Sequence, residues 1–125
     1  MDTPKKVHYA NIDNYSRRLI LQYQGREIAA TDRALILKEV SGKRVFDPVF
    51  YVPQEDIEID LVRDPESKGY CPIKGKSYRW YLKENPTEEY FGWSYEDPLP
   101  EAIFLRGHIA FNGRYVTFVS APRPL

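Results

Sequence analysis

The chain has 125 residues, 42% of them hydrophobic and 14% aromatic, which suffices for one domain whose core needs no disulfides. Its 18 Lys and Arg residues balance its 18 Asp and Glu residues, which excludes bulk electrostatic attraction to nucleic acid or to an anionic membrane. A single cysteine forms no internal disulfide, no apolar run is long enough to cross a bilayer, and no apolar stretch follows the basic N-terminal residues. We therefore expect a cytoplasmic protein that binds neither nucleic acid nor membranes.

Residues 1–15 are polar and weakly patterned, which predicts a flexible N-terminal arm or a short edge element. Leu19, Leu21 and Tyr23 then alternate with less apolar neighbours, as one face of a strand does. Gln24-Gly25 predicts a tight turn into a second strand.

The apolar run at residues 34–39 fits a strand or a helix, and the turn at 41–43 favours a strand. Pro48 indicates an edge or a bulge in the next strand. Beyond it, three apolar residues alternate with acidic ones, which predicts a strand with one buried face: Ile57, Ile59 and Leu61 inward, with Asp56, Glu58 and Asp60 on a solvated face. Those three carboxylates are an alternative site for Mg²⁺ or Mn²⁺, but a solvated face explains them better.

The second half of the chain continues the β pattern. Residues 77–82 read as a strand, residues 83–89 as a loop, and residues 100–106 as a short helix that begins at a proline. Asn112-Gly113 predicts a type I′ hairpin between strands at 108–111 and 115–119. The predicted fold is therefore mainly β: a single domain over residues 16–125, built as a compact antiparallel β-sandwich or open barrel with one short helix near 100–106.

Two motifs carry side chains that are suited to chemistry. In the first, Cys71-Pro72-Ile73-Lys74-Gly75, nearby lysines favour the thiolate of Cys71, so this residue is either a nucleophile or a small core residue. Lys74 on a glycine turn can hold a phosphate or a carboxylate, or it can be a solvated lysine, and Gly75 lets a ligand approach the backbone.

The second motif runs from Phe91 to Pro100 and contains Trp93-Ser94-Tyr95. Trp93 and Tyr95 are expected on one face of a strand, where they form either an aromatic wall for a flat ligand or a core anchor. We expect Tyr78 to line the same pocket.

The two histidines, His8 and His108, have no Cys or His partner at metal-ligand spacing, so no metal site is expected. His108 is more typical of a half-buried structural histidine than of a base. The chain contains no G-x-S-x-G, no H-E-x-x-H, no Walker loop and no Rossmann fingerprint.

The order of three motifs, CPxKG, WSYxDPLP and GxxAF (residues 107–111), resembles the DUF427 family of small proteins of unknown function, over about residues 17–119. Cys71, Pro72, Lys74 and Gly75 match the CPxKG signature, whereas Gly69 stands where the family often has Thr. The resemblance implies a site at these motifs but no reaction. The family carries a nucleotidyltransferase-like label, but the chain lacks the Gly-Ser and paired-aspartate pattern of nucleotide transfer.

Three functions are compatible with these motifs. The first is a binding module for a small anionic or aromatic metabolite, with ligand-binding residues Cys71, Lys74, Gly75, Tyr78, Trp93 and Tyr95. The second is an enzyme that uses Cys71 or Lys74 for thiol chemistry or phosphate-handling transfer. The third is a structural or interaction protein. The motifs imply no particular cofactor or oligomeric state.

Overall fold

The structure of the chain is a computed structural model that describes residues 7–125. Within these residues the chain forms strands and two short 3₁₀ helices. The first half contains β1 (His8–Asn14), β2 (Arg18–Tyr23), β3 (Arg26–Thr31), β4 (Leu35–Ser41), β5 (Arg44–Val45), β6 (Val49–Pro53), η1 (Gln54–Asp56) and β7 (Leu61–Arg63). The second half contains β8 (Gly69–Cys71), β9 (Gly75–Leu82), β10 (Gly92–Ser94), η2 (Pro100–Leu105), β11 (His108–Phe111) and β12 (Thr117–Ala121).

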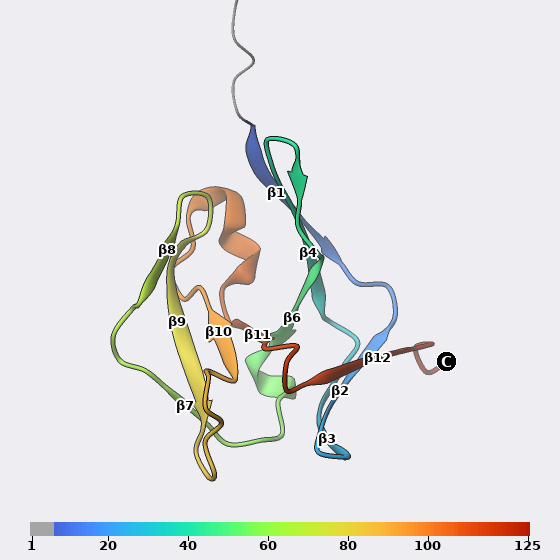
Figure 1. Cartoon of the computed structure of the whole chain (residues 1–125). Helices are drawn as coiled ribbons and strands as arrows, with labels where there is room; N and C mark the ends of the chain where they lie inside the picture. The colour runs from blue at the N-terminus through green and yellow to red at the C-terminus, as the bar shows by residue number, and fades with distance from the viewer. Residues whose placement is uncertain (1–6) are drawn as a thin grey trace, which may run out of the picture.

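The strands form two antiparallel sheets. The larger has nine strands in the order β1-β4-β6-β11-β10-β9-β7, with β5 on β4 and β8 on β9. It curls so that η2 lies between its β1–β4 side and its β8–β9 side, while the smaller sheet, β12-β2-β3, lies below β1 and β4 (Figure 1). The prediction of a mainly β fold is confirmed, with an open half-barrel and a short helical segment at residues 100–105.

The central strands of the large sheet are buried on both faces. In the first of two hydrophobic clusters lie Val52 of β6 and Ile109 of β11. Their neighbours Tyr51 and Ala110 lie in the second cluster, on the opposite face. The first cluster is shared with β2 and β3, and the second with η2. Because side chains alternate along a strand, two adjoining central strands supply both cores.

The alternation predicted after η1 is present, although only its end is a strand. Ile57, Ile59 and Leu61 are half-buried against the first cluster, and Glu58 and Asp60 are exposed. Asp56 departs from the prediction because it lies in η1 rather than on a strand.

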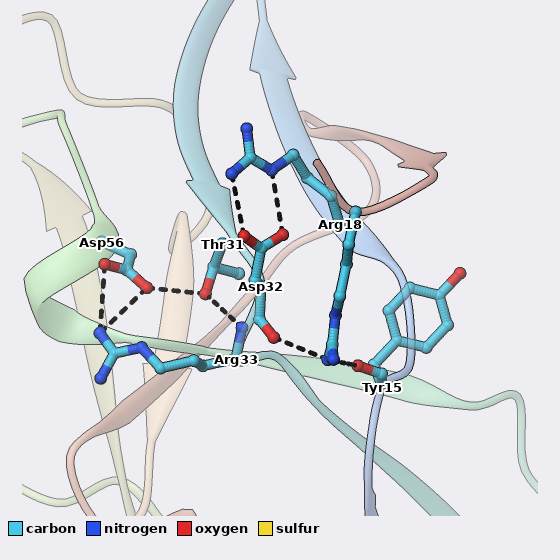
Figure 2. A network of polar contacts seen from close by, with 7 residues as sticks. Tyr15, Arg18, Thr31, Asp32, Arg33 and Asp56 are labelled. Atoms are coloured by element: carbon cyan, nitrogen blue, oxygen red, sulfur yellow. Dashed lines mark hydrogen bonds and ion pairs between the residues drawn. The ribbon is translucent and has the colours of Figure 1, made fainter. Parts of the chain in front are cut away.

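The Asp56 carboxylate belongs to a polar network that fixes η1 against β3 (Figure 2). It accepts hydrogen bonds from Thr31 Oγ1 at 2.7 Å and from Arg33 Nη2 at 3.2 Å. Beside it, Arg18 holds Asp32 through two bonds of 3.0 and 2.9 Å. These partners give Asp56 a structural role, so it does not form a row of carboxylates with Glu58 and Asp60.

Of the two alternatives predicted for residues 1–15, a flexible arm and a short edge element, the structure shows the edge element at residues 8–14. Residues 8–14 form the edge strand β1, which pairs with β4 along its whole length, and residues 1–6 lie outside the described residues. The segment looked weakly patterned because an edge strand buries only one face, and here that face carries small or polar residues such as His8 and Ala10.

Two of the predicted turns, Gln24-Gly25 and Asn112-Gly113, have different outcomes. Gln24 and Gly25 both have positive φ, 51° and 74°, as the β2–β3 hairpin requires. The hairpin predicted at Asn112-Gly113 is wrong, because β11 joins the large sheet and β12 pairs with β2. Asn112 instead caps this turn by accepting from the Arg114 N–H at 3.0 Å, and its side-chain amide donates to Tyr90 O.

None of the helices within residues 7–125 is long and apolar enough to cross a membrane.

Truncation of the first core tests this packing. Ile28 is fully buried in it, so Ile28→Ala should lower the free energy of unfolding by about 2–5 kcal/mol in urea denaturation. Val62, which is 50% exposed, is the control, and Val62→Ala should change the free energy of unfolding by less than about 0.5 kcal/mol. Equal losses in the two variants would contradict the assignment of the core.

Candidate functional site

The CPxKG motif forms the tight connection between β8 and β9. Cys71 pairs with Gly75 across the hairpin, and the Lys74 N–H donates to Cys71 O at 3.2 Å. Pro72 stands where a β-turn favours proline, and Gly75 has φ 103°, which side-chain-bearing residues resist. Ile73 is buried and anchors the turn, so Cys71 and Lys74 are held on a rigid frame.

The two motifs meet through their backbones. The Leu99 N–H donates to Lys74 O at 3.0 Å, which joins the DPLP segment to the CPxKG turn. A Cβ at Gly75 would lie 3.5 Å from both Asp97 O and Leu99 N, so the glycine lets the two segments pack closely. Residues more than twenty positions apart thus form one wall.

Lys74 is paired with Glu39 of β4. Its Nζ lies 2.7 Å from Glu39 Oε1, and the two side chains are 11% and 13% exposed. Asp97, in the neighbouring DPLP segment, contacts Arg106 at 3.3 Å. The pair therefore ties the CPxKG turn to the opposite side of the curled sheet.

Both members of this pair are charged at neutral pH. Burial is the largest single influence and disfavours the Lys74 ammonium, but the hydrogen bond to Glu39 and the electrostatic effects of Tyr95, Glu39 and Cys71 together outweigh it and raise the pKa of Lys74 above its usual value. Burial likewise opposes the Glu39 carboxylate, but hydrogen bonds with Lys74 and His8 lower the pKa of Glu39. A charged Lys74 is a poor amine nucleophile, which argues against covalent chemistry at this residue.

His8 and Cys71 lie at the second oxygen of Glu39. His8 Nε2 is 2.8 Å from Glu39 Oε2, across the β1–β4 pairing in which Ala10 stands opposite Glu39. One ligating atom each of His8, Glu39 and Cys71 lies within 4.8 Å of the other two. These residues come from β1, β4 and β8, so their spacing in the sequence gave no sign of this cluster.

Aromatic side chains surround the ion pair. Trp93 and Tyr95 both pack in the second cluster, as their alternation predicted, and Lys74 Nζ lies 5.4 Å from the centre of the Tyr95 ring. Trp93 Nε1 donates to the Tyr51 hydroxyl at 3.4 Å. Burial raises the pKa of both Tyr51 and Tyr95, so these phenols stay protonated at neutral pH.

A cavity of about 560 Å³ opens beside the ion pair. Its lining includes both Lys74 and Trp93, so residues of the two motifs share one concavity. The β4–β5 hairpin and the chain after it supply the opposite wall. The lining residues are Leu37, Glu39, Arg44, Val45, Phe46, Asp47, Val49, Lys74, Trp93 and Tyr95.

Three of the expected pocket residues are not part of this lining. Gly75 and Tyr78 line a separate depression near Leu99 and Arg106, and the Cys71 sulfur lies close to Glu39 and His8. Tyr78 is opposite Ser94 in the β9–β10 pairing, so its side chain shares the face of Ser94 and not that of Trp93. The expectation that Tyr78 joins the aromatic wall is therefore corrected by the strand register.

Sequence reasoning missed several residues of the site. Glu39 had a detectable signal, because it continues the inward phase of Leu35 and Leu37 on β4. His8 and Arg44 had none, since their positions depend on which strands pair.

A double-mutant cycle tests the ion pair. Lys74→Met leaves Glu39 with one fewer partner and should lower the free energy of unfolding by about 1–3 kcal/mol. In a Glu39→Gln background the same change should cost clearly less, as measured by urea denaturation of all four proteins. Strictly additive losses would show that the two side chains do not stabilise each other.

A comparison with known protein families agrees with the resemblance seen in the motifs. The family model described as a domain of unknown function, DUF427, matches residues 11–121, a range that contains CPxKG and WSYxDPLP as well as Glu39. No match was found among curated proteins. Because the family match covers most of the chain, the protein belongs to the DUF427 family.

Proposed function

We propose that the protein binds a small molecule that has a flat ring and an acidic group, in the cavity between the two motifs and the β4–β5 hairpin. The observation that carries the proposal is that Lys74 and Trp93 line the same cavity. A lone lysine binds anions weakly in water, and a lone aromatic wall does not orient a ligand, but the two together do both.

The lining supports each half of this ligand. Phe46, Trp93 and Tyr95 offer ring faces and edges, and the Arg44 guanidinium lies 4.4 Å from the centre of the Phe46 ring. An ammonium has three N–H donors, so the hydrogen bond from Lys74 to Glu39 leaves it capacity for an acidic ligand. Arg44 adds a planar fork that suits carboxylate or phosphate.

The cavity volume also supports a small ligand, because about 560 Å³ lies within the roughly 300–1,000 Å³ typical of such sites. A depression of about 670 Å³ lies elsewhere, beside Glu58, Asp60 and Glu84. We favour the smaller cavity because several aromatic rings line it and its two cations balance its two acids, Glu39 and Asp47. The larger one has a single cation, Arg26, against three acids.

Heteronuclear NMR tests the proposal, because the two tryptophans give two indole N–H signals. Trp80→Phe assigns them. Indole acetate and adenosine monophosphate are the probes, and indole ethanol and adenosine are their uncharged counterparts. At least one acidic probe should shift the Trp93 signal saturably and more strongly than its uncharged counterpart.

Arg44→Met should weaken that binding about tenfold, which corresponds to about 1.4 kcal/mol for one lost charged contact. Arg26→Met is the matched control, because Arg26 lines the other depression. Binding that is indifferent to Arg44, or that shifts only the Trp80 signal, would place the ligand elsewhere and contradict the proposal.

Thiol catalysis is the second candidate, and the closeness of His8 and Glu39 to Cys71 favours it. An activated Cys71 should react with iodoacetamide at pH 7 about tenfold faster than glutathione, after treatment with a chelator. His8→Ala should remove this advantage if the imidazole activates the thiol, and His108→Ala should not. A thiol no faster than glutathione would leave Cys71 as a packing residue of the second core.

The third candidate, a structural or interaction protein, rests on the Lys74–Glu39 pair as a tie between distant strands. It gains support if the ion pair stabilises the fold while none of the probes binds. The balanced charge supports a small molecule rather than nucleic acid or a membrane as the partner, and the single unpaired cysteine supports a cytoplasmic setting.

A further inference from the structure

We propose that His8, Glu39 and Cys71 form a binding site for a divalent transition-metal ion of the zinc type. Each offers one ligating atom, a ring nitrogen, a carboxylate oxygen and a sulfur, and these atoms all lie within 4.8 Å of one another. The site shares Glu39 with the lining of the cavity, and its test does not depend on any organic ligand.

The backbone holds the three ligands from different directions. His8 and Glu39 are diagonal neighbours on one face of the β1–β4 pair, where Ala10 stands opposite Glu39. Cys71 is fixed by its pairing with Gly75 at the end of the β8–β9 hairpin. Because all three are half-buried, their side chains have little freedom to turn away.

The distances are close to those of a metal site. Zinc bonds of about 2.0–2.3 Å with tetrahedral geometry place neighbouring ligand atoms about 3.3–3.7 Å apart. The present spread of up to 4.8 Å therefore needs shifts of only about 1–1.5 Å, which side-chain rotations provide. The hydrogen bond of 2.8 Å between His8 and Glu39 would be replaced by two bonds to the ion.

The chemistry of the donors selects the ion. Nitrogen and sulfur ligands favour Zn²⁺ and its neighbours over Mg²⁺ or Ca²⁺, and three protein ligands leave a fourth position for water or another group. The thiolate and carboxylate charges offset the charge of the ion. Lys74 would remain on Glu39 Oε1 as an outer partner that orients the carboxylate.

Cobalt binding tests the site, because Cys71 is the only cysteine in the chain and a thiolate-to-cobalt band can therefore come only from this residue. Titration of the full, untagged chain with Co²⁺ should give a thiolate-to-cobalt charge-transfer band together with strong tetrahedral ligand-field bands, saturating at one ion per chain. Excess Zn²⁺ should abolish both. Without a charge-transfer band, or with one ion for every two chains, the proposed site is wrong.

Variants assign the ligands. Cys71→Ser should abolish the charge-transfer band, and His8→Ala should raise the Kd for Co²⁺ at least tenfold, since losing even an outer partner of a ligand costs about that much. His108→Ala is the control, because His108 bonds to Arg106 O away from the cluster, and it should bind like the parent protein. Circular dichroism establishes that each variant is folded, and a folded His8→Ala protein with unchanged affinity would overturn the assignment of His8.

Discussion

Burial of the central strands of the large sheet on both faces is the constraint on which the rest of the structure depends. The central strands β6 and β11 send alternate side chains into two cores, so neither face is available for ordinary solvated residues. The small sheet covers one face and η2 the other. A polar side chain on the η2 face must therefore find a partner within the protein, because leaving a buried charge unpaired costs several kcal/mol. Lys74 and His8 satisfy this requirement because each contacts one carboxylate oxygen of Glu39.

Local patterns predicted the parts of the fold that depend on local physics. The alternation of Leu19 and Leu21 and the Gln24-Gly25 turn need only the period of a strand and the conformational freedom of the turn residues. The Asn112-Gly113 segment failed because its two flanking strands found partners in different sheets, and tertiary pairing overrode the turn preference. For residues 1–15 the sequence left a flexible arm and a short edge element open, because the pairing of β1 with β4 spans a long stretch of sequence.

The residues of the candidate site also fall into those that the sequence could predict and those that depend on strand pairing. Its motif residues Lys74, Trp93 and Tyr95 could be chosen from the sequence because rigid turn formers stand beside aromatic or charged side chains. Which of their neighbours share the cavity depends on strand register, and the face of Tyr78 follows from its pairing with Ser94 alone. His8 and Glu39 could not be joined to Cys71 without knowing that β1, β4 and β8 converge, since no spacing rule links three separate strands.

The ion pair also bears on whether the site is structural or functional. Replacing a buried ion pair with apolar side chains of similar volume is often neutral or stabilising, so stability alone gives little reason to keep charges in a core. Here a lysine, a carboxylate, an imidazole and a thiol gather beside a cavity, in a cluster that an apolar core would fill more simply. A sequence that departs from the ordinary composition of a core tends to do so where a site is required. The concentration of charged and ligating groups on the η2 face therefore favours a site that binds a molecule or an ion over a purely structural one.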